Sequence, residues 1–597
     1  MYTKCLKNVD RKNVFDDGVP LLPKSRTSKQ KIEISMNMIR IAFVVVIANL
    51  AFLTSSATLA QNSIWNGGPS GTWNSNTWTN GIPGVQTNAT AVFSNFPGLN
   101  VISLAGPVAV PFNGINASNG NLLDLRLNGL SMTFTSSAQL SGSIVISSNA
   151  GGTGITSPTF AFTGLNLELK QGGTLTANSV SSSATGTVTL STGGTLNLNS
   201  TGVISLPSVV YVFNGGTLNS AGTYQLNSGQ SLSGYGALNS RFTGLAASNL
   251  AVSNGNLLVG SSNPDGFATS GNVTVASGRT LQVNDSNFAT FGGNTQLQGG
   301  TIENVNSALF SGIAITSGAT LTGYGLLNGR VTADVGSTIV ASGGNLTIGD
   351  ASKLSFFSSG DLHTGDQTVT LRGTNRATLG SVTSLGNLSA GVLVVDRGAL
   401  VDFGRVLVGH GTVDSINTLA NAMIINGDVI GNSTLDRITF DGYVKGMGTF
   451  ENVTMNGTFA PGLSPSLLFT NNLALGNSSV LEMEIGGLVA GTEHDKLIDS
   501  GMLQLDGTLK LVLFNGYVPV AGDSFDLLDW TTFSGGFSDI DLSQAVLSSG
   551  LSWDLSNLYS SGVVNVAAVP EPTSFALLAT FGIVTLVSRV RQSRVRA

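Results

Sequence analysis

A short motif recurs along the middle of the chain at nearly constant spacing. The tetrapeptide Gly-Gly-Thr-Leu begins at Gly172, Gly193 and Gly215, which are 21 and 22 residues apart, and variants begin at Gly299 and Gly343. A longer motif, Ser-Gly-Tyr-Gly-Ala-Leu-Asn-Ser-Arg at 233–241, returns 89 residues later as Thr-Gly-Tyr-Gly-Leu-Leu-Asn-Gly-Arg at 322–330, and decayed copies begin at 409 and 446. A period near 21 residues is typical of one turn of a β-solenoid.

The residues inside each repeat explain why such turns must stack. In Thr174-Leu175-Thr176 and similar runs, every second side chain is apolar, so each short strand has one inward face. One turn cannot bury that face alone, whereas stacked turns bury it jointly. Glycine allows the chain to bend between strands, and aligned Asn and Thr side chains can form ladders. A string of β-sandwiches is the alternative, but it would show longer strands and no 21-residue echo. We therefore expect an all-β chain, a parallel β-helix or β-solenoid.

The composition argues against several classes of function, among them nucleic-acid binding and cysteine-based metal binding. Residues 61–569 contain 14 Lys and Arg against 28 Asp and Glu, a net charge near −14, without the clustered basic residues that nucleic acid requires. Charged residues are only 10% and hydrophobic residues 41%, which argues against disorder. The one cysteine is Cys5, so residues 61–569 have neither disulfides nor cysteine-based metal sites. We expect no nucleic-acid partner, no metal and no cofactor.

The C-terminal thirty residues form a distinct tail. Pro570-Glu571-Pro572 precedes a mostly apolar run from Phe575 to Val587, and four arginines follow: Arg589, Arg591, Arg594 and Arg596. As a helix the apolar run would be ~20 Å long against a hydrocarbon core of ~30 Å, so it predicts a marginal transmembrane helix. The arginines predict a cytoplasmic end. A buried terminal strand or helix is the alternative, which four arginines near the end disfavour.

This tail resembles the C-terminal sorting tail of PEP-CTERM proteins, which Gram-negative bacteria export and process with an exosortase. The resemblance implies that an exosortase recognises Pro570, Glu571 and Pro572 and cuts near them. It also implies transient anchoring in the inner membrane, followed by transfer of the body to the cell surface or an extracellular polysaccharide matrix, as in a biofilm.

The N-terminal segment has the layout of a secretory signal. Arg40 precedes an apolar run from Ile41 to Leu53, and small residues follow. We expect export through the Sec machinery and cleavage between Ala60 and Gln61, with cleavage after Ala57 as the alternative. The 35 residues before Met36 are basic and lack hydrophobic periodicity, so either the signal has a long basic region or translation starts at Met36 or Met38.

Two further segments flank the repeats. Residues 65–93 are similar to the Trp-rich opening of autotransporter-type and PEP-CTERM β-helical proteins, and the resemblance is carried by Trp65, Trp73, Trp78, Pro83, Ala91 and Phe93. These indoles either close the open end of the solenoid or stack on sugars, and burial is the commoner role of tryptophan. From Gly457 onward, alternating runs such as 480–485 and 509–513 resemble the C-terminal β module of the same group, which caps the solenoid or adds an antiparallel unit.

These observations divide the chain into six parts. They are an N-terminal extension (1–35), a signal peptide with a signal helix (36–60), a Trp-rich cap (61–100), β-solenoid repeats (101–456), a C-terminal β module (457–566) and the sorting tail (567–597).

The sequence contains no convincing catalytic constellation. His363, His410 and His494 are far apart and lack metal-ligand spacing. His410 replaces tyrosine in the Gly-Tyr-Gly motif and is interpreted as a repeat position, whereas His494 and Asp495 are expected on a solvated turn. Stacked turns can align distant carboxylates as glycosidases require, but one sequence does not show such alignment.

We therefore expect an exported, surface-directed structural or adhesive protein without catalytic activity. The alternatives are a carbohydrate-active enzyme on a β-helix, such as a polysaccharide lyase or glycosidase, and a non-catalytic glycan-binding protein, with exopolysaccharide as a partner.

Overall fold

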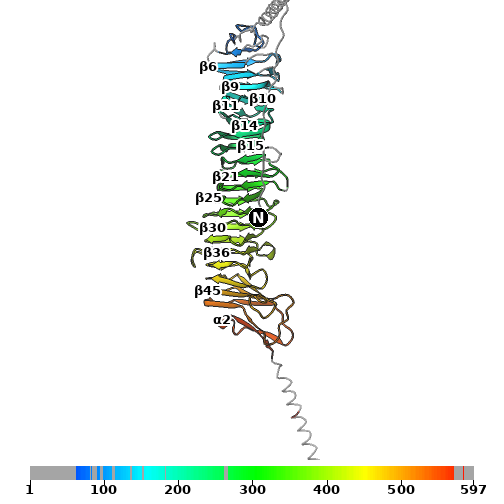
Figure 1. Cartoon of the computed structure of the whole chain (residues 1–597), viewed down its shortest axis with the longest axis vertical. Helices are drawn as coiled ribbons and strands as arrows, with labels where there is room; N and C mark the ends of the chain where they lie inside the picture. The colour runs from blue at the N-terminus through cyan, green and yellow to red at the C-terminus, as the bar shows by residue number, and fades with distance from the viewer. Residues whose placement is uncertain are drawn as a thin grey trace, which may run out of the picture. The chain divides into compact units, whose positions relative to one another are not determined.

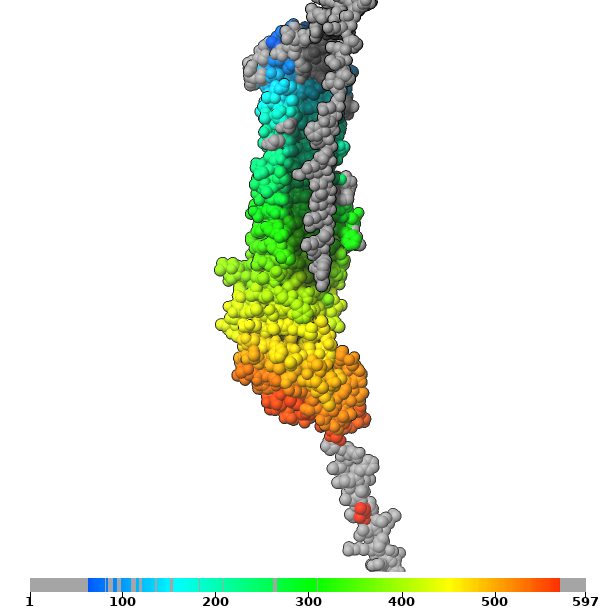
Figure 2. Space-filling view, viewed as in Figure 1, coloured from blue at the N-terminus to red at the C-terminus, as the bar shows by residue number. Residues whose placement is uncertain are grey.

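The computed structural model describes residue 583 and residues 62–569, except 81, 84–89, 94–97, 110–113, 135–136, 151–153, 182, 207, 261–265 and 309. The chain divides into two compact units, Met1–Leu59 and Ala60–Ala597, and the described residues belong to the second. They form an all-β parallel β-solenoid of about 16 turns with almost no helix, which confirms the architecture predicted from the repeat. Turns follow one another in sequence order from β6 (Gly114–Arg126) to β45 (Lys496–Leu505) (Figure 1), and the surface view shows the same order (Figure 2).

Apart from three strands near the C-terminal end, the described strands pair in three parallel ladders. β15 (Ser231–Gly244) passes through all of them, because its three parts pair with three different parts of the next turn: Leu232 with Leu250, Leu238 with Val259 and Phe242 with Phe267. Other long strands that bend around corners are β9 (Ile155–Lys170) and β14 (Ser208–Leu226). The inward side chains of all three ladders meet in one continuous apolar core.

The later turns use shorter strands. In the first ladder these are β27 (Asp361–His363), β30 (Val382–Leu385), β33 (Val406–Gly409), β36 (Asp428–Gly431), β39 (Thr449–Glu451), β42 (Leu467–Asn471), β45 and β48 (Leu528–Gly535). The second ladder contains β28 (Thr368–Leu371), β31 (Gly391–Val395), β34 (Gly411–Ser415), β37 (Ile438–Phe440), β40 (Val453–Met455) and β43 (Ala474–Leu475). The third contains β29 (Ala377–Thr378), β32 (Ala399–Val401), β35 (Met423–Ile425), β38 (Val444–Gly446), β41 (Thr458–Pro461), β44 (Val480–Ile485), β46 (Thr508–Leu513) and β49 (Asp539–Gln544).

The Gly-Gly-Thr-Leu repeats lie directly above one another. Leu175 pairs with Leu196 and Leu196 with Leu218, and all three side chains are fully buried. Beside them an outward ladder of amides runs along the stack. The Asn197 amide donates to the Thr176 hydroxyl at 3.1 Å, and two further Asn amides each donate to the Asn of the preceding turn, Asn219 to Asn197 at 2.8 Å and Asn239 to Asn219 at 2.9 Å. The ladder satisfies polar groups that alternate with the core leucines.

The repeated Gly-Tyr-Gly motif forms a corner between two ladders. Gly323 and Gly325 have φ of 117° and 130°, a region that other residues rarely adopt, and Gly234 and Gly236 have similar values. A Cβ at Gly323 would lie 1.8 Å from the backbone oxygen of Leu297 in the preceding turn. The motif therefore recurs because the corner requires glycine for both its conformation and its close approach.

A small antiparallel sheet follows the parallel ladders at the C-terminal end. It consists of β47 (Ser524–Asp526), β51 (Val563–Ala568) and β50 (Leu551–Asp554), and the short helix α2 (Leu558–Ser561) precedes β51. Parallel pairing itself continues through β48 and β49, so within 457–566 only these three strands depart from the solenoid pattern.

Aromatic rings stack within the core of the central turns. Tyr224, Phe242, Phe267 and Phe291 follow one another with ring centroids 6.4, 5.2 and 5.0 Å apart, and Tyr211 contacts the first of them. The Tyr211 side chain is 1% exposed, and its hydroxyl has no hydrogen-bond partner among the described residues. Burying an unsatisfied hydroxyl costs free energy that a phenyl ring avoids.

We expect Tyr211→Phe to raise the free energy of unfolding by about 1–2 kcal/mol, because it removes an unsatisfied hydroxyl and keeps the ring. Urea unfolding followed by circular dichroism measures the change. Tyr443→Phe is the matched control, since the Tyr443 hydroxyl donates to Glu482 at 3.0 Å and its loss should destabilise. A destabilised Tyr211→Phe variant would contradict the assignment of an unsatisfied hydroxyl.

Candidate functional site

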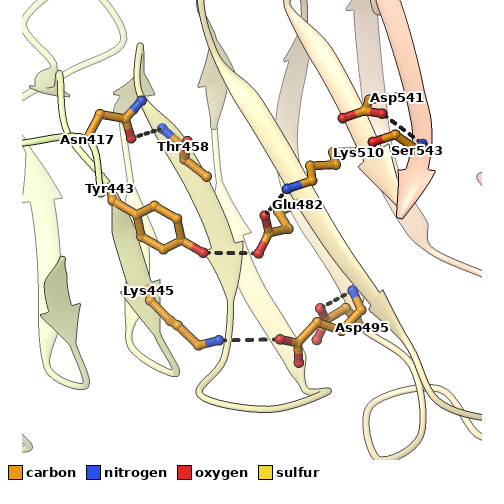
Figure 3. Close-up of polar contacts among 10 residues, drawn as sticks. Asn417, Tyr443, Lys445, Thr458, Glu482, Asp495, Lys510, Asp541 and Ser543 are labelled. Atoms are coloured by element: carbon orange, nitrogen blue, oxygen red, sulfur yellow. Dashed lines mark hydrogen bonds and ion pairs between the residues drawn. The ribbon is translucent and has the colours of Figure 1, made fainter. Parts of the chain in front are cut away.

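A polar groove crosses the outer face of the third ladder near its C-terminal end. Its volume is ≈ 560 Å³, within the usual range for ligand sites. We call it the polar groove, and its lining consists of Asn417, Thr418, Leu419, Tyr443, Thr458, Val480, Glu482, Thr508, Lys510, Asp539 and Asp541. These residues come from β41, β44, β46 and β49, from the residue before β38, and from the segment that leads into the 3₁₀ helix η1 (Leu419–Asn421). Figure 3 shows the polar contacts around this groove.

Alternation along β44 and β46 places the charged side chains of the groove on its floor. Leu481 and Met483 point into the core, so Glu482 between them faces outward. Parallel register then aligns Glu482 with Lys510, and Lys510 with Asp541. Three charged positions from three successive turns therefore form one outward row across the groove.

Ala460 provides room for contacts that span two turns. It occupies the outward position between Lys445 and the acidic residues of β44, and its side chain is too short to fill that position. Tyr443 packs against Ala460 and is only 8% exposed. Tyr443 and Lys445 therefore reach past the alanine to Glu482 and Glu484, each 39 residues further along the chain.

Glu482 is the centre of this network. One carboxylate oxygen accepts from the Tyr443 hydroxyl at 3.0 Å, and the other accepts from the Lys510 ammonium at 2.9 Å (Figure 3). The Glu482 and Lys510 side chains are 16% and 20% exposed, so water screens this pair only partly. Burial, together with the neighbouring Glu482 and Glu484 carboxylates, raises the pKa of Tyr443. The tyrosine is thus a hydrogen donor that stays protonated.

A second network lies beside the groove, two residues further along the chain from Tyr443 and Glu482. Lys445 approaches Glu484 at 3.4 Å, and both side chains are 12% exposed. The backbone N–H groups of Glu484 and Ser466 each donate to the fully buried Asp495 carboxyl at 2.7 Å. Burial raises the pKa of Asp495 to about 8, against the opposing effect of these two hydrogen bonds. This carboxyl, directly before β45, therefore links β44 to the segment that leads into β42.

The rim of the groove is polar as well. The backbone N–H of Thr458 donates to the Asn417 side chain at 3.1 Å, which holds the segment before η1 against β41. On the opposite side, hydrogen bonds from the side chain and backbone N–H of Ser543 lower the pKa of Asp541. Asp541 is therefore held as a carboxylate.

The three tryptophans of the N-terminal segment form a buried cluster. Trp65, Trp73 and Trp78 are 1%, 0% and 6% exposed, and Trp78 lies 5.1 and 5.2 Å from the other two ring centroids. Each indole N–H donates to a backbone carbonyl. These positions favour end closure over the alternative of a sugar-stacking platform, because the rings are buried against one another and against Phe93.

The three histidines have different hydrogen-bond partners and form no common site among the described residues. His363 contacts the Ser384 hydroxyl at 2.6 Å and His410 contacts Asn432 at 3.1 Å, and no group of three or more metal-ligating side chains occurs among the described residues. The expectation of a solvated turn around His494 is wrong. His494 and Asp495 are 1% and 0% exposed, because His494 packs edge-on against Phe525 of β47.

Several predicted sites lie outside the described residues. They are the signal cleavage site at Ala60 and Gln61, the signal helix, the motif Pro570, Glu571 and Pro572, the C-terminal transmembrane helix, and Arg589, Arg591, Arg594 and Arg596. Within the part of the chain that is described, no helix has the length and apolar character needed to cross a membrane.

Sequence reasoning missed the polar groove. The central polar residues of the groove are Tyr443, Glu482 and Lys510. The one pattern in the sequence that indicates them is a charged residue at alternate positions of an otherwise apolar strand, as in Val480-Leu481-Glu482-Met483-Glu484. No protein-family model matches the chain, and no curated protein matches it.

Proposed function

We propose that this chain is an exported β-solenoid that serves a structural or adhesive role at the cell surface or in an extracellular polysaccharide matrix. In this proposal the Sec machinery exports it, the tail anchors it transiently in the inner membrane, and an exosortase recognises Pro570, Glu571 and Pro572. The order of motif, apolar run and arginines in the tail is the observation that carries the proposal.

Features of the folded body support a structural role. The core is continuous over the stacked turns, and each turn hydrogen-bonds to the next through backbone and side-chain ladders. Buried tryptophans lie in the first described turns, and an antiparallel sheet follows the last. Closed ends prevent strand edges from pairing with other chains. A thiol-free body suits an oxidising exterior without depending on it.

The last described strand, β51, ends at Ala568, two residues before the proposed motif. The Val569 backbone N–H donates to the Gly550 oxygen at 2.8 Å, and Pro570 is the next residue. Cleavage near Pro570–Pro572 would therefore release the solenoid without cutting into any described strand. This arrangement is the one expected if the tail is a separable anchor.

We expect replacement of Pro570, Glu571 and Pro572 by alanine to reduce the surface-released fraction of the protein at least tenfold, with retention in the inner membrane. Cell fractionation with immunoblotting of each fraction measures this distribution. Alanine at the adjacent Thr573 and Ser574 is the matched control, which should leave release unchanged. Unaltered release of the motif variant would overturn the sorting proposal.

A further inference from the structure

The polar groove runs along the stack rather than along a strand. Its lining comes from consecutive strands of one ladder, β41, β44, β46 and β49, with Tyr443 just before β38. Neighbouring strands lie about 4.8 Å apart, so five strands cover roughly 19 Å. A ligand that fills the groove must therefore be elongated and must lie across the strands.

The lining offers hydrogen bonds more than apolar contact. The lining contains the hydroxyls of Thr418, Thr458 and Thr508 together with carboxylates and one amide, and the apolar contributions are Leu419 and Val480. A chain of hydroxyl groups can both donate to the carboxylates and accept from the hydroxyls. This chemistry suits a polyol chain.

The charge of the groove selects against anionic ligands. It contains the carboxylates of Glu482, Asp539 and Asp541 and one ammonium, that of Lys510. The ammonium is paired with Glu482 at 2.9 Å, so it offers little attraction to a second anion. A polyuronide would face uncompensated negative charge, whereas an uncharged chain would not.

The hydrogen bonds of Glu482 and Asp541 in the groove do not suit the acid of a glycoside hydrolase. A glycosidase needs one carboxylic acid that is protonated in the resting state and one carboxylate. Glu482 accepts from an ammonium and a hydroxyl, and hydrogen bonds from Ser543 lower the pKa of Asp541. The pKa of Asp541 is lowered, and both carboxyl oxygens of Glu482 already accept hydrogen bonds, so neither group is placed to donate a proton to a ligand.

We infer that the polar groove binds a neutral, hydroxyl-rich glycan chain lying along the stack, and that it does so without cleaving the chain. This inference goes beyond export and sorting, and it is tested on purified protein, so its outcome is independent of where the protein is delivered in the cell.

The test is isothermal titration of the full-length chain in a sugar-free polyoxyethylene detergent. The probes are neutral hexasaccharides of glucose, mannose and xylose, an alginate hexasaccharide as the anion, and a chitosan hexasaccharide as the cation. Thr508→Trp fills the groove from an outward position of β46, and Thr347→Trp, at an outward position of β25 (Thr338–Ile348), is the matched control. Asp539→Ala with Asp541→Ala is a second variant that leaves the core unchanged.

We expect at least one neutral hexasaccharide to bind, and its Kd to rise at least tenfold in Thr508→Trp and in the double aspartate variant but not in Thr347→Trp. Binding should change less than twofold between 50 and 500 mM salt, and the sugar should be recovered intact. Absence of neutral binding, equal binding by both tryptophan variants, preference for the charged hexasaccharides or release of shorter products would each overturn the inference.

Discussion

Replacing Gly323 with alanine should destabilise the central turns of the solenoid by roughly 3 kcal/mol or more. Its φ of 117° alone costs a residue with a Cβ on the order of 1–3 kcal/mol. The added Cβ would also lie 1.8 Å from the Leu297 oxygen, so the two turns must separate. Because stacked turns depend on their neighbours, the loss should spread from this corner to the adjacent turns.

Gly318→Ala is the matched control for this prediction. Gly318 has φ of 77° and is exposed, and no atom lies within 4 Å of the position that its Cβ would take, so only the backbone cost of about 1 kcal/mol applies. Hydrogen exchange measured by mass spectrometry localises the effect, which a single unfolding midpoint of a repeat protein does not. Equal loss of protection in the two variants would contradict the corner geometry.

The second large effect is a loss of stability as the pH rises from 5 to 8. The folded protein keeps a proton on Asp495, whose pKa is raised by burial to about 8, whereas the unfolded chain releases it near pH 4. The proton therefore stabilises the fold fully below about pH 4, and this contribution is lost progressively as the pH rises through 8. At about 1.4 kcal/mol per pH unit, the change amounts to several kcal/mol.

Asp495→Asn separates this carboxyl from other groups that titrate nearby. The amide stays neutral, so the free energy of unfolding of the variant should no longer fall with pH through this position. The variant should nevertheless be less stable than the unaltered protein at pH 5, because its NH₂ group faces a backbone N–H donor. Burial lowers the pKa of His494, so this residue makes the free energy of unfolding rise with pH below about pH 6.5. The effect is the same in both proteins and cancels in the difference between their free energies of unfolding. The check is urea unfolding of both proteins at pH 5, 6, 7 and 8, and a constant difference across this range would contradict the assignment.

The sequence predicted the parallel solenoid because the central turns are nearly equal in length. Where Gly-Gly-Thr-Leu recurs every 21 or 22 residues, equal spacing places Thr174, Thr195 and Thr217 in register. The Gly-Tyr-Gly motif was equally informative, since its backbone conformation admits little else than glycine. His410 fills the same position, between Gly409 at φ 117° and Gly411 at φ 145°, as the repeat indicated.

The polar groove was not predictable in the same way, because the turns that build it differ in length. Tyr443 and Glu482 are 39 residues apart, and Glu482 and Lys510 are 28 residues apart, so no fixed period aligns them. The burial of His494 was missed for a related reason. Phe525, which covers it, belongs to an antiparallel sheet whose strands β47 and β51 are far apart in sequence.

We expect both ends of this chain to be removed as the solenoid is delivered to the cell surface. Intact-mass measurement of the protein recovered from the surface or matrix fraction tests it most directly. The expected mass is that of a body that begins near Gln61 and ends near Pro570–Pro572. Recovery of the uncleaved chain of 597 residues from the cytosol, with none at the surface, would contradict it.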